Sequence, residues 1–272
     1  MTKQTVIESG MRLRRLDPRE WWEHKHVLSY LIYRDSIGRY KQTVLGVVWV
    51  VAQPLIEAAI FTLIFRHVFH PDITLPYPVF VFSGVMIWSY ASVTIQRATT
   101  SIVGHANLIK RLYFPKVLLP VSVACSRFID LLITMVALLI IAYFYHVEIG
   151  LLWLWTIPLL ILAAIAATAI GMWFSILHVY YRDTGLAVPY LLRIGLFVTP
   201  VFYPLQAMPE RWHLLISLNP FTGILTSFRE VLSGMAPFLN TSLALSISMT
   251  GILFISAIIV FHACESTLID EL

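Results

Sequence analysis

The sequence predicts an all-α polytopic membrane protein, and three observations carry that prediction. Of the 272 residues, 58% are hydrophobic and only 12% are charged, whereas a soluble domain carries about twice that charged share. Several apolar runs are long enough to cross about 30 Å of hydrocarbon. The charged residues are concentrated before and between these runs. The composition therefore argues against a cytosolic enzyme, a secreted module and a disordered chain.

Six apolar runs are interpreted as membrane spans. The fifth is the shortest and contains Pro189, Arg193 and Pro200. The six runs cover residues 46–69, 79–102, 117–145, 151–179, 186–203 and 241–262.

The distribution of Lys and Arg predicts the orientation of these spans. Thirteen lie in the first 45 residues and in the connections after the second and fourth spans, whereas only Arg211 and Arg229 are counted on the other side. This asymmetry places both termini in the cytoplasm, which requires an even number of spans. It predicts a multi-pass membrane protein.

Residues 204–240, between the fifth and sixth runs, are apolar but interrupted by proline and glycine. Their two pieces, 210–218 and 221–232, are too short to cross the bilayer and are predicted to be re-entrant half-helices packed against protein. An ordinary outer loop with interfacial helices is the alternative. The predicted organisation is a cytoplasmic arm (1–45), a membrane domain (46–262) and a cytoplasmic tail (263–272).

Residues 19–40 are predicted to form an amphipathic helix at the membrane surface. Trp21, Leu28 and Leu31 can share one helix face. Aromatic rings and cations placed just before a span suit the headgroup region. A plain membrane anchor with no further role fits these features equally well.

The residue patterns indicate neither a catalytic nor a metal site. The sequence has no G-x-x-x-x-G-K-[ST], C-x-x-C, H-E-x-x-H or G-x-S-x-G pattern. His67, His70 and Asp72 have a spacing that permits metal binding, but no second ligand cluster supports it. We therefore expect no metal and no cofactor in this chain.

Three of the ionisable residues in the predicted spans lie well away from the span ends, whereas Arg97 and Arg193 lie nearer the cytoplasmic ends. Each costs about 3 kcal/mol at mid-bilayer unless it is paired or hydrated. Glu57 lies midway along the first run, and Arg127 and Asp130 are three residues apart in the third, which allows them to pair on one helix face. Such a pair fits either a lock between helices or the polar lining of a translocation path.

Aromatic residues are concentrated toward the outer halves of the first two runs. Phe61, Phe65, Trp88 and Tyr90 are the main examples. They fit an interfacial aromatic belt, or a channel lining over which sugar rings could slide. The sequence does not distinguish lipid-facing rings from channel-facing ones.

Residues 34–65, RDSIGRYKQTVLGVVWVVAQPLIEAAIFTLIF, resemble the opening of the ABC-2 type permeases that export cell-surface polysaccharides such as O-antigen, capsule and teichoic acid. Later segments resemble further landmarks of that family in the same order. They are NLIKRLYFPK (107–116), YYRD (180–183), TPVFYP (199–204) and LNP (218–220).

The resemblance implies six spans in the bacterial cytoplasmic (inner) membrane, an interface helix before the first span and re-entrant helices before the last. It further implies a homodimer with two copies of a separate ATPase, which holds the ATP and Mg, and a lipid-linked glycan as substrate. No nucleic-acid partner is expected. The N-terminal helix and the first cytoplasmic loop are the parts expected to contact the ATPase. Their residues at the matching positions are Arg34, Asp35, Arg39, Tyr40, Lys110, Arg111, Phe114, Pro115 and Lys116.

Two other functions remain open on the sequence. The same fold could serve an ABC-2 permease for a small lipid or drug-like compound. A polytopic membrane sugar transferase would need clustered acidic or His residues at one membrane face, whereas the carboxylates here are scattered. The sequence names neither the glycan, its lipid carrier nor the type of envelope, and it does not say whether the ATPase carries a domain that selects the cargo.

Overall fold

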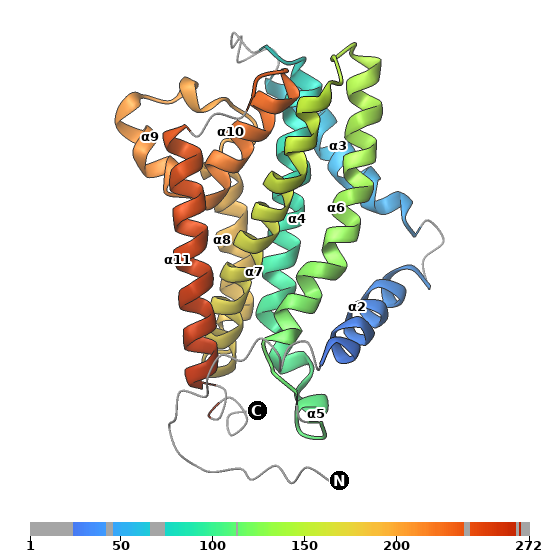
Figure 1. The fold of residues 1–272 in the computed structure, drawn as a ribbon, viewed down its shortest axis with the longest axis vertical. Helices are drawn as coiled ribbons and strands as arrows, with labels where there is room; N and C mark the ends of the chain where they lie inside the picture. The colour runs from blue at the N-terminus through green and yellow to red at the C-terminus, as the bar shows by residue number, and fades with distance from the viewer. Residues whose placement is uncertain are drawn as a thin grey trace.

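The computed structural model describes residues 24–41, 46–65, 74–112, 114–236, 240–264 and 267. Throughout these ranges the regular elements are helices (Figure 1). The prediction of an all-α membrane protein is confirmed. The helices are α2 (Lys25–Tyr40), α3 (Val48–Phe65), α4 (Tyr77–Gly104), α5 (Ala106–Ile109), α6 (Leu118–Phe144), η1 (Leu151–Trp155), α7 (Thr156–Tyr180), α8 (Thr184–Val198), η2 (Leu205–Ala207), α9 (Glu210–Ser217), α10 (Pro220–Leu232) and α11 (Thr241–Cys264).

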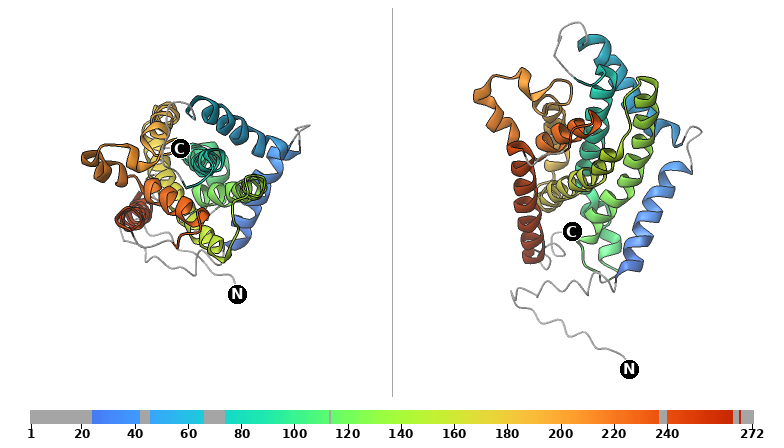
Figure 2. Two further views of the ribbon diagram at one scale, coloured as in Figure 1. Left: turned by 90° about the horizontal axis from the view of Figure 1, so that it is seen from above. Right: turned by 45° about the horizontal axis from the view of Figure 1, so that its top comes forward.

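Five helical stretches in the described residues are long and apolar enough to cross a membrane: α3, α4, α6, η1 with α7, and α11. They coincide with the first four predicted runs and the sixth. α4 lies near the centre of the bundle (Figure 2) and contacts α3, α6, α7, α8 and α10. Its central position explains why it is the most buried of the long helices, whereas few residues of α3 and α11 are buried.

The predicted fifth span is wrong at its end. The prediction ran to residue 203, but α8 ends at Val198, and Thr199 already has an extended backbone (φ −77°, ψ 138°). Pro200 explains the break, because proline disfavours the helical conformation of the residue before it. With 15 residues, α8 is about 22 Å long, shorter than the hydrocarbon core.

The two short helices predicted before the last span are present as α9 and α10. They differ in burial: α9 is mostly exposed, whereas Ile224, Leu225 and Phe228 of α10 are fully buried. α10 packs against α4, α7 and α11 inside the bundle. The burial of α10 is what a re-entrant helix requires, since exposed loop backbone is not tolerated in hydrocarbon.

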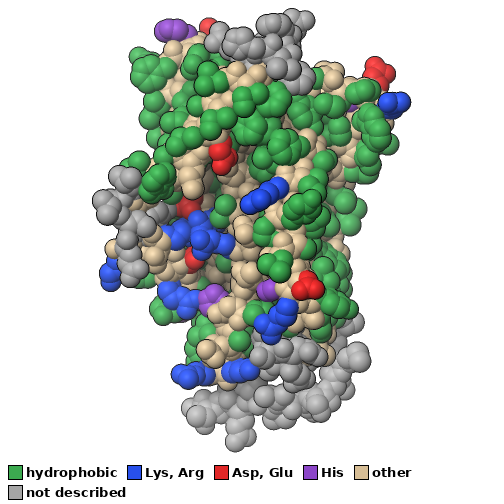
Figure 3. Space-filling view, turned by 180° about the vertical axis from the view of Figure 1, so that it is seen from behind, with side chains coloured by type: hydrophobic (Ala, Val, Ile, Leu, Met, Phe, Trp, Pro, Cys, Tyr) green, Lys and Arg blue, Asp and Glu red, His purple; other side chains and the backbone are tan. Residues whose placement is uncertain are grey.

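The bundle has two distinct ends (Figure 1). One carries α5, the start of α2, the α7–α8 connection and the end of α11; we call it the α5 end. The other carries η2 and α9; we call it the α9 end. Seen from behind, the molecule is covered largely by hydrophobic side chains, and most Lys and Arg visible on this face lie toward the α5 end (Figure 3).

α2 lies beside the lower part of α6 rather than within the bundle (Figure 1). Leu31 anchors it in a hydrophobic cluster at the α5 end that includes Phe114, Leu118, Ile176 and Phe261. Tyr30 and Tyr33 are exposed. A helix is thus present within the predicted range 19–40, but its amphipathic character at a membrane surface stays a prediction; residues 19–23, with Trp21, lie outside the described residues.

Candidate functional site

A cavity of about 530 Å³ lies between α3, α4, α6 and α8. Its walls combine aromatic, amide, hydroxyl and charged side chains. They include Trp49, Gln53 and Glu57 of α3; Trp88, Ser89, Tyr90, Ser92 and Gln96 of α4; Arg127, Asp130 and Thr134 of α6; Pro189, Arg193 and Leu196 of α8; and Arg39 of α2.

The cavity lies around the middle of the bundle, because its lining residues fall within 86–96 on α4 and 127–134 on α6, near the middle of each helix. On α3, which runs away from the α5 end, the last lining residue is Glu57, and on α8 it is Leu196. One turn farther along α3 stands Phe61, whose ring lies 3.7 Å, centroid to centroid, from that of Phe202. An aromatic stack thus lies between the cavity and the α9 end.

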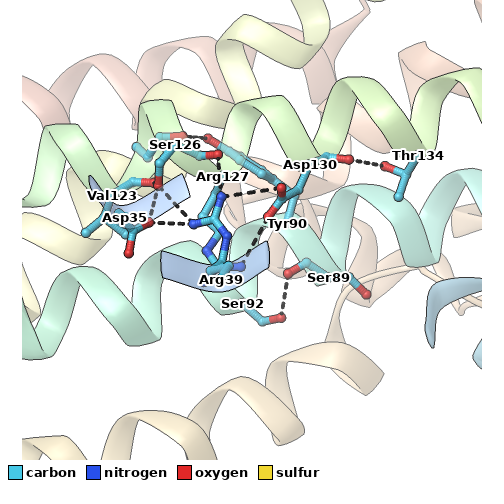
Figure 4. Close-up of polar contacts among 11 residues, drawn as sticks. Asp35, Arg39, Ser89, Tyr90, Ser92, Val123, Ser126, Arg127, Asp130 and Thr134 are labelled. Carbon is cyan, nitrogen blue, oxygen red and sulfur yellow. Dashed lines mark hydrogen bonds and ion pairs between the residues drawn. The ribbon is translucent and has the colours of Figure 1, made fainter. Parts of the chain in front are cut away.

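A charged and hydroxyl network borders the cavity where α2 meets α6 (Figure 4). The Arg39 guanidinium lies 2.5 Å from Asp35 Oδ2 and 3.4 Å from Asp130 Oδ1. It also donates to the Ser126 carbonyl at 3.0 Å. Arg127 donates to Asp130 Oδ2 at 3.1 Å. Asp130 therefore accepts from two arginines and joins α2 to α6.

The predicted pairing of Arg127 with Asp130 is confirmed. The sequence did not indicate that Arg39 links α2 to α6. Its side chain points toward α6 and is only 12% exposed. Asp35 supports this arrangement by accepting from both Arg39 and the Ser126 hydroxyl. The contact of α2 with an ATPase stays a prediction, and in this geometry Arg39 would act on it through the position of α2.

Glu57 and Arg193 face the open side of the cavity. Both are exposed, and neither forms a hydrogen bond or ion pair within the described ranges. They stand among exposed apolar residues such as Ile56, Ile60 and Ile194. Placing ionisable groups in contact with lipid costs free energy. We therefore expect water or another protein surface, rather than lipid, next to Glu57 and Arg193.

The connection between α4 and α6 divides into an exposed and a buried part. Lys110, Arg111 and Leu112 are exposed, whereas Phe114, Pro115 and Lys116 are buried. Nearby, the Arg34 guanidinium of α2 contacts the His105 ring at the end of α4. The buried part ties the loop to the core, and the exposed part is free to meet a partner. The side chain of Tyr40 lies outside the described residues.

The four predicted aromatic residues have different environments. Trp88 and Tyr90 line the cavity but are largely buried, and the Tyr90 hydroxyl donates to the Ala124 carbonyl at 3.3 Å. Phe61 and Phe65 lie beyond the cavity in the stack with Phe202. Trp88 and Tyr90 are buried, and Phe61 and Phe65 are half-buried.

The environment of two important residues was not predicted. Phe202 was placed in the fifth span among the aromatic residues biased toward its outer half, and Arg229 was counted only as a charge of the outer side. The structure buries both: Phe202 is 1% exposed and Arg229 is 6% exposed. A signal existed for Arg229, since a cation in an apolar, proline-bounded segment needs buried acceptors.

No group of three or more His, Cys, Asp or Glu that could hold a metal occurs in the part of the chain that the structure describes. His67, His70 and Asp72 lie outside it. The arrangement is suited to holding or passing a polar molecule within the membrane.

Residues 26–233 match the ABC-2 type transporter family. The chain is 28% identical to an O-antigen export system permease protein RfbA of Klebsiella pneumoniae over 206 residues, which is 75% of this chain and 79% of that protein. It is 26% identical to the protein of that name from Myxococcus xanthus over 78% of this chain and 82% of the relative. It is 23% identical to the polysialic acid transport protein KpsM of Escherichia coli over 76% and 81%, respectively.

Proposed function

Because this chain belongs to the ABC-2 type transporter family, we propose that it is the membrane subunit of an ATP-driven exporter of a lipid-linked cell-surface polysaccharide. The observation that carries the proposal is the cavity between α3, α4, α6 and α8, which offers hydroxyl, amide and aromatic groups inside an apolar bundle. Such a surface suits sugar rings, which combine polar edges with apolar faces. The named relatives, which are O-antigen and polysialic acid transport proteins, support the same class of cargo.

The active unit is proposed to contain two copies of this chain. Support comes from α3 and α8, whose exposed faces are apolar yet carry Glu57 and Arg193 at the edge of the cavity. A second copy placed against these helices would remove both charges from lipid and enclose the cavity within a central channel.

Energy would come from two copies of a separate ATPase, consistent with the lack of a P-loop pattern in this sequence. The ATPase would bind at the α5 end, where α2 and the exposed part of the α4–α6 connection lie side by side. The accumulation of Lys and Arg at this end favours its placement in the cytoplasm. Both termini would then be cytoplasmic, and this chain would itself make and break no covalent bond.

The central experiment is purification of the tagged chain from its native membrane in mild detergent, followed by identification and native mass measurement of what accompanies it. A P-loop subunit in equal amount, in a complex of two plus two, is the expected result. A chain that elutes alone, under conditions that preserve other ABC complexes, would contradict the proposed partnership.

Arg111→Glu is expected to reduce recovery of that ATPase about tenfold, the equivalent of roughly 1.4 kcal/mol of binding energy. Arg111 is exposed next to Lys110, so reversal of its charge should weaken an interface without disturbing the core. Arg211→Glu is the matched control, because Arg211 is also exposed but lies on α9 at the opposite end. Equal recovery with both variants would remove this loop from the interface.

Ser92→Trp is expected to reduce polysaccharide at the cell surface about tenfold while the complex with the ATPase is retained. Ser92 lines the cavity, and an indole in its place would occupy space needed by the cargo. Leu132→Trp is the control, since Leu132 is 48% exposed and lies on α6 outside the cavity lining. Normal export by the Ser92 variant at normal abundance would show that the cargo does not pass through this cavity.

A further inference from the structure

The break after α8 leaves backbone carbonyls in a buried position. Thr199 and Val201 are fully buried, and Pro200 is buried between them. The Thr199 carbonyl accepts from the Val201 N–H at 2.6 Å, whereas the Pro200 and Val201 carbonyls have no backbone donor among the described residues, because the helix has ended. Unsatisfied carbonyls in an apolar interior are costly, so the conformation of this segment depends on donors supplied from elsewhere.

Arg229 of α10 supplies these donors. Its Nη1 donates to the Pro200 carbonyl at 2.7 Å, and its Nη2 donates to the Val201 carbonyl at 2.6 Å and to the Phe80 carbonyl at 3.2 Å. The guanidinium also lies 3.5 Å above the centre of the Phe80 ring. One side chain thus joins α10, α4 and the segment after α8.

The fit around Arg229 is close. A Cβ atom added to Gly84 of α4 would lie 2.5 Å from Arg229 Nη2 and 2.6 Å from the Val201 carbonyl oxygen. Only a residue without a side chain allows the three elements to approach in this way. A second link comes from Asn219, whose amide donates to the Thr199 hydroxyl at 2.7 Å. The α9–α10 pair therefore holds the segment at both of its ends.

The next residue, Phe202, is positioned by these contacts. Its backbone carbonyl accepts from the Tyr77 hydroxyl at 2.9 Å. Its ring stacks on Phe61 and lies 6.0 Å, centroid to centroid, from Phe65. We call Phe61, Phe65 and Phe202 the aromatic stack. The stack joins α3 to the segment that follows α8, and α3 and α8 are the helices that carry Glu57 and Arg193 on the open side of the cavity.

We propose that Arg229 is the positioning residue of a closure formed by the aromatic stack, which separates the cavity from the α9 end of the bundle. Two hydrogen bonds fix the backbone on either side of the Phe202 peptide unit. Arg229 donates to the Val201 carbonyl, just before Phe202, and Tyr77 donates to the carbonyl of Phe202 itself. Movement of α10 away from α4 would release Pro200 and Val201 together and allow the Phe202 ring to leave Phe61. Only the identification of the cavity as the route of the cargo rests on the proposed function.

The test is the reactivity of a cavity cysteine toward a membrane-impermeant methanethiosulfonate reagent, applied to intact cells from the side on which α9 lies. Ser89→Cys, introduced after replacement of Cys125 and Cys264 by alanine, places the thiol in the cavity wall. We expect protection with Arg229 in place and labelling faster by about tenfold in Arg229→Gln, as the closed population falls. Arg211→Gln, on exposed α9, should leave the rate unchanged.

A general loosening of the fold is detected with a second reporter, Ala163→Cys, because Ala163 is fully buried in the packed part of α7. Parallel labelling of both reporters, or continued protection of the cavity thiol in a folded Arg229→Gln protein, would overturn the proposal. If Arg229→Gln does not accumulate, Phe202→Ala and Tyr77→Phe replace it, and protection in both would also overturn it. The readout needs neither ATPase nor export, so its failure is separable from failure of the proposed function.

Discussion

Replacing Gly223 with alanine is expected to prevent the chain from accumulating as a folded protein. Gly223 lies on α10 where this helix meets the start of α11. A Cβ atom at this position would lie 2.1 Å from the Ser242 carbonyl oxygen and 2.6 Å from Ser246 Oγ. Because the nearest obstacle is backbone, a rotamer change cannot relieve the clash. The cost should exceed the usual overpacking penalty of about 1–3 kcal/mol.

The close contact between α10 and α11 also includes a hydrogen bond that the substitution would strain. The Gly223 amide donates to Ser246 Oγ at 3.0 Å. Moving the helices apart to admit a methyl group would lengthen this bond and loosen the contact between α10 and α11. Since α10 carries Arg229, the damage would extend to the segment after α8.

Abundance in membranes and the melting temperature of the detergent-solubilised protein measure this effect. Gly251→Ala is the control, because Gly251 is on α11 and a Cβ atom added there would have no other atom within 4 Å. Alanine there should be neutral or slightly stabilising through its helix propensity. Wild-type abundance and melting temperature in Gly223→Ala would contradict the close packing of α10 on α11.

The features predicted correctly from the sequence are those determined by neighbours along the chain. The long helices follow from apolar runs, α9 and α10 follow from short apolar pieces between prolines, and the pairing of Arg127 with Asp130 follows from their spacing of three residues. In each case the residues that determine the feature lie within a few helical turns of one another along the chain.

The features that were missed depend on residues far apart in the sequence. Arg39 meets Ser126 and Asp130 some 90 residues away, and Arg229 meets Phe80 at a separation of 149. No periodicity within α2 or α10 specifies these partners. The end of α8 was placed too late, because Pro200 was included in the predicted span although it ends the helix. The carbonyls of the extended segment that follows are satisfied by Arg229 from another helix, which no local pattern specifies.

Charge reversal in Arg39→Glu is expected to abolish export and the coupling of the chain to ATP hydrolysis. Arg39 is the only described side chain that bonds both Asp35 of its own helix and Asp130 of α6. A carboxylate in its place would face both of these anions. Breaking a fully buried ion pair by removal of one partner costs about 3–5 kcal/mol. The Arg39 pairs are part-buried, so the cost should be smaller, but it would weaken the contact between α2 and α6. We would measure surface polysaccharide and the ATPase rate of the purified complex.

Two comparisons show which contact of Arg39 matters. Lys41→Glu reverses an equal charge two residues away at an exposed position, and it should leave both measurements near wild type. Asp35→Lys combined with Arg39→Glu restores the i,i+4 pair within α2 with its signs exchanged, but it leaves a negative charge facing Asp130. If the tie between α2 and α6 is what transmits movement, the double variant stays inactive, whereas the further change Asp130→Asn recovers part of the activity by removing the repulsion. If the double variant Asp35→Lys, Arg39→Glu recovers activity without the change at Asp130, the role of Arg39 would instead be to stabilise α2 itself. The connection between α2 and the cavity would then have to run through Leu31 and the hydrophobic cluster at the α5 end.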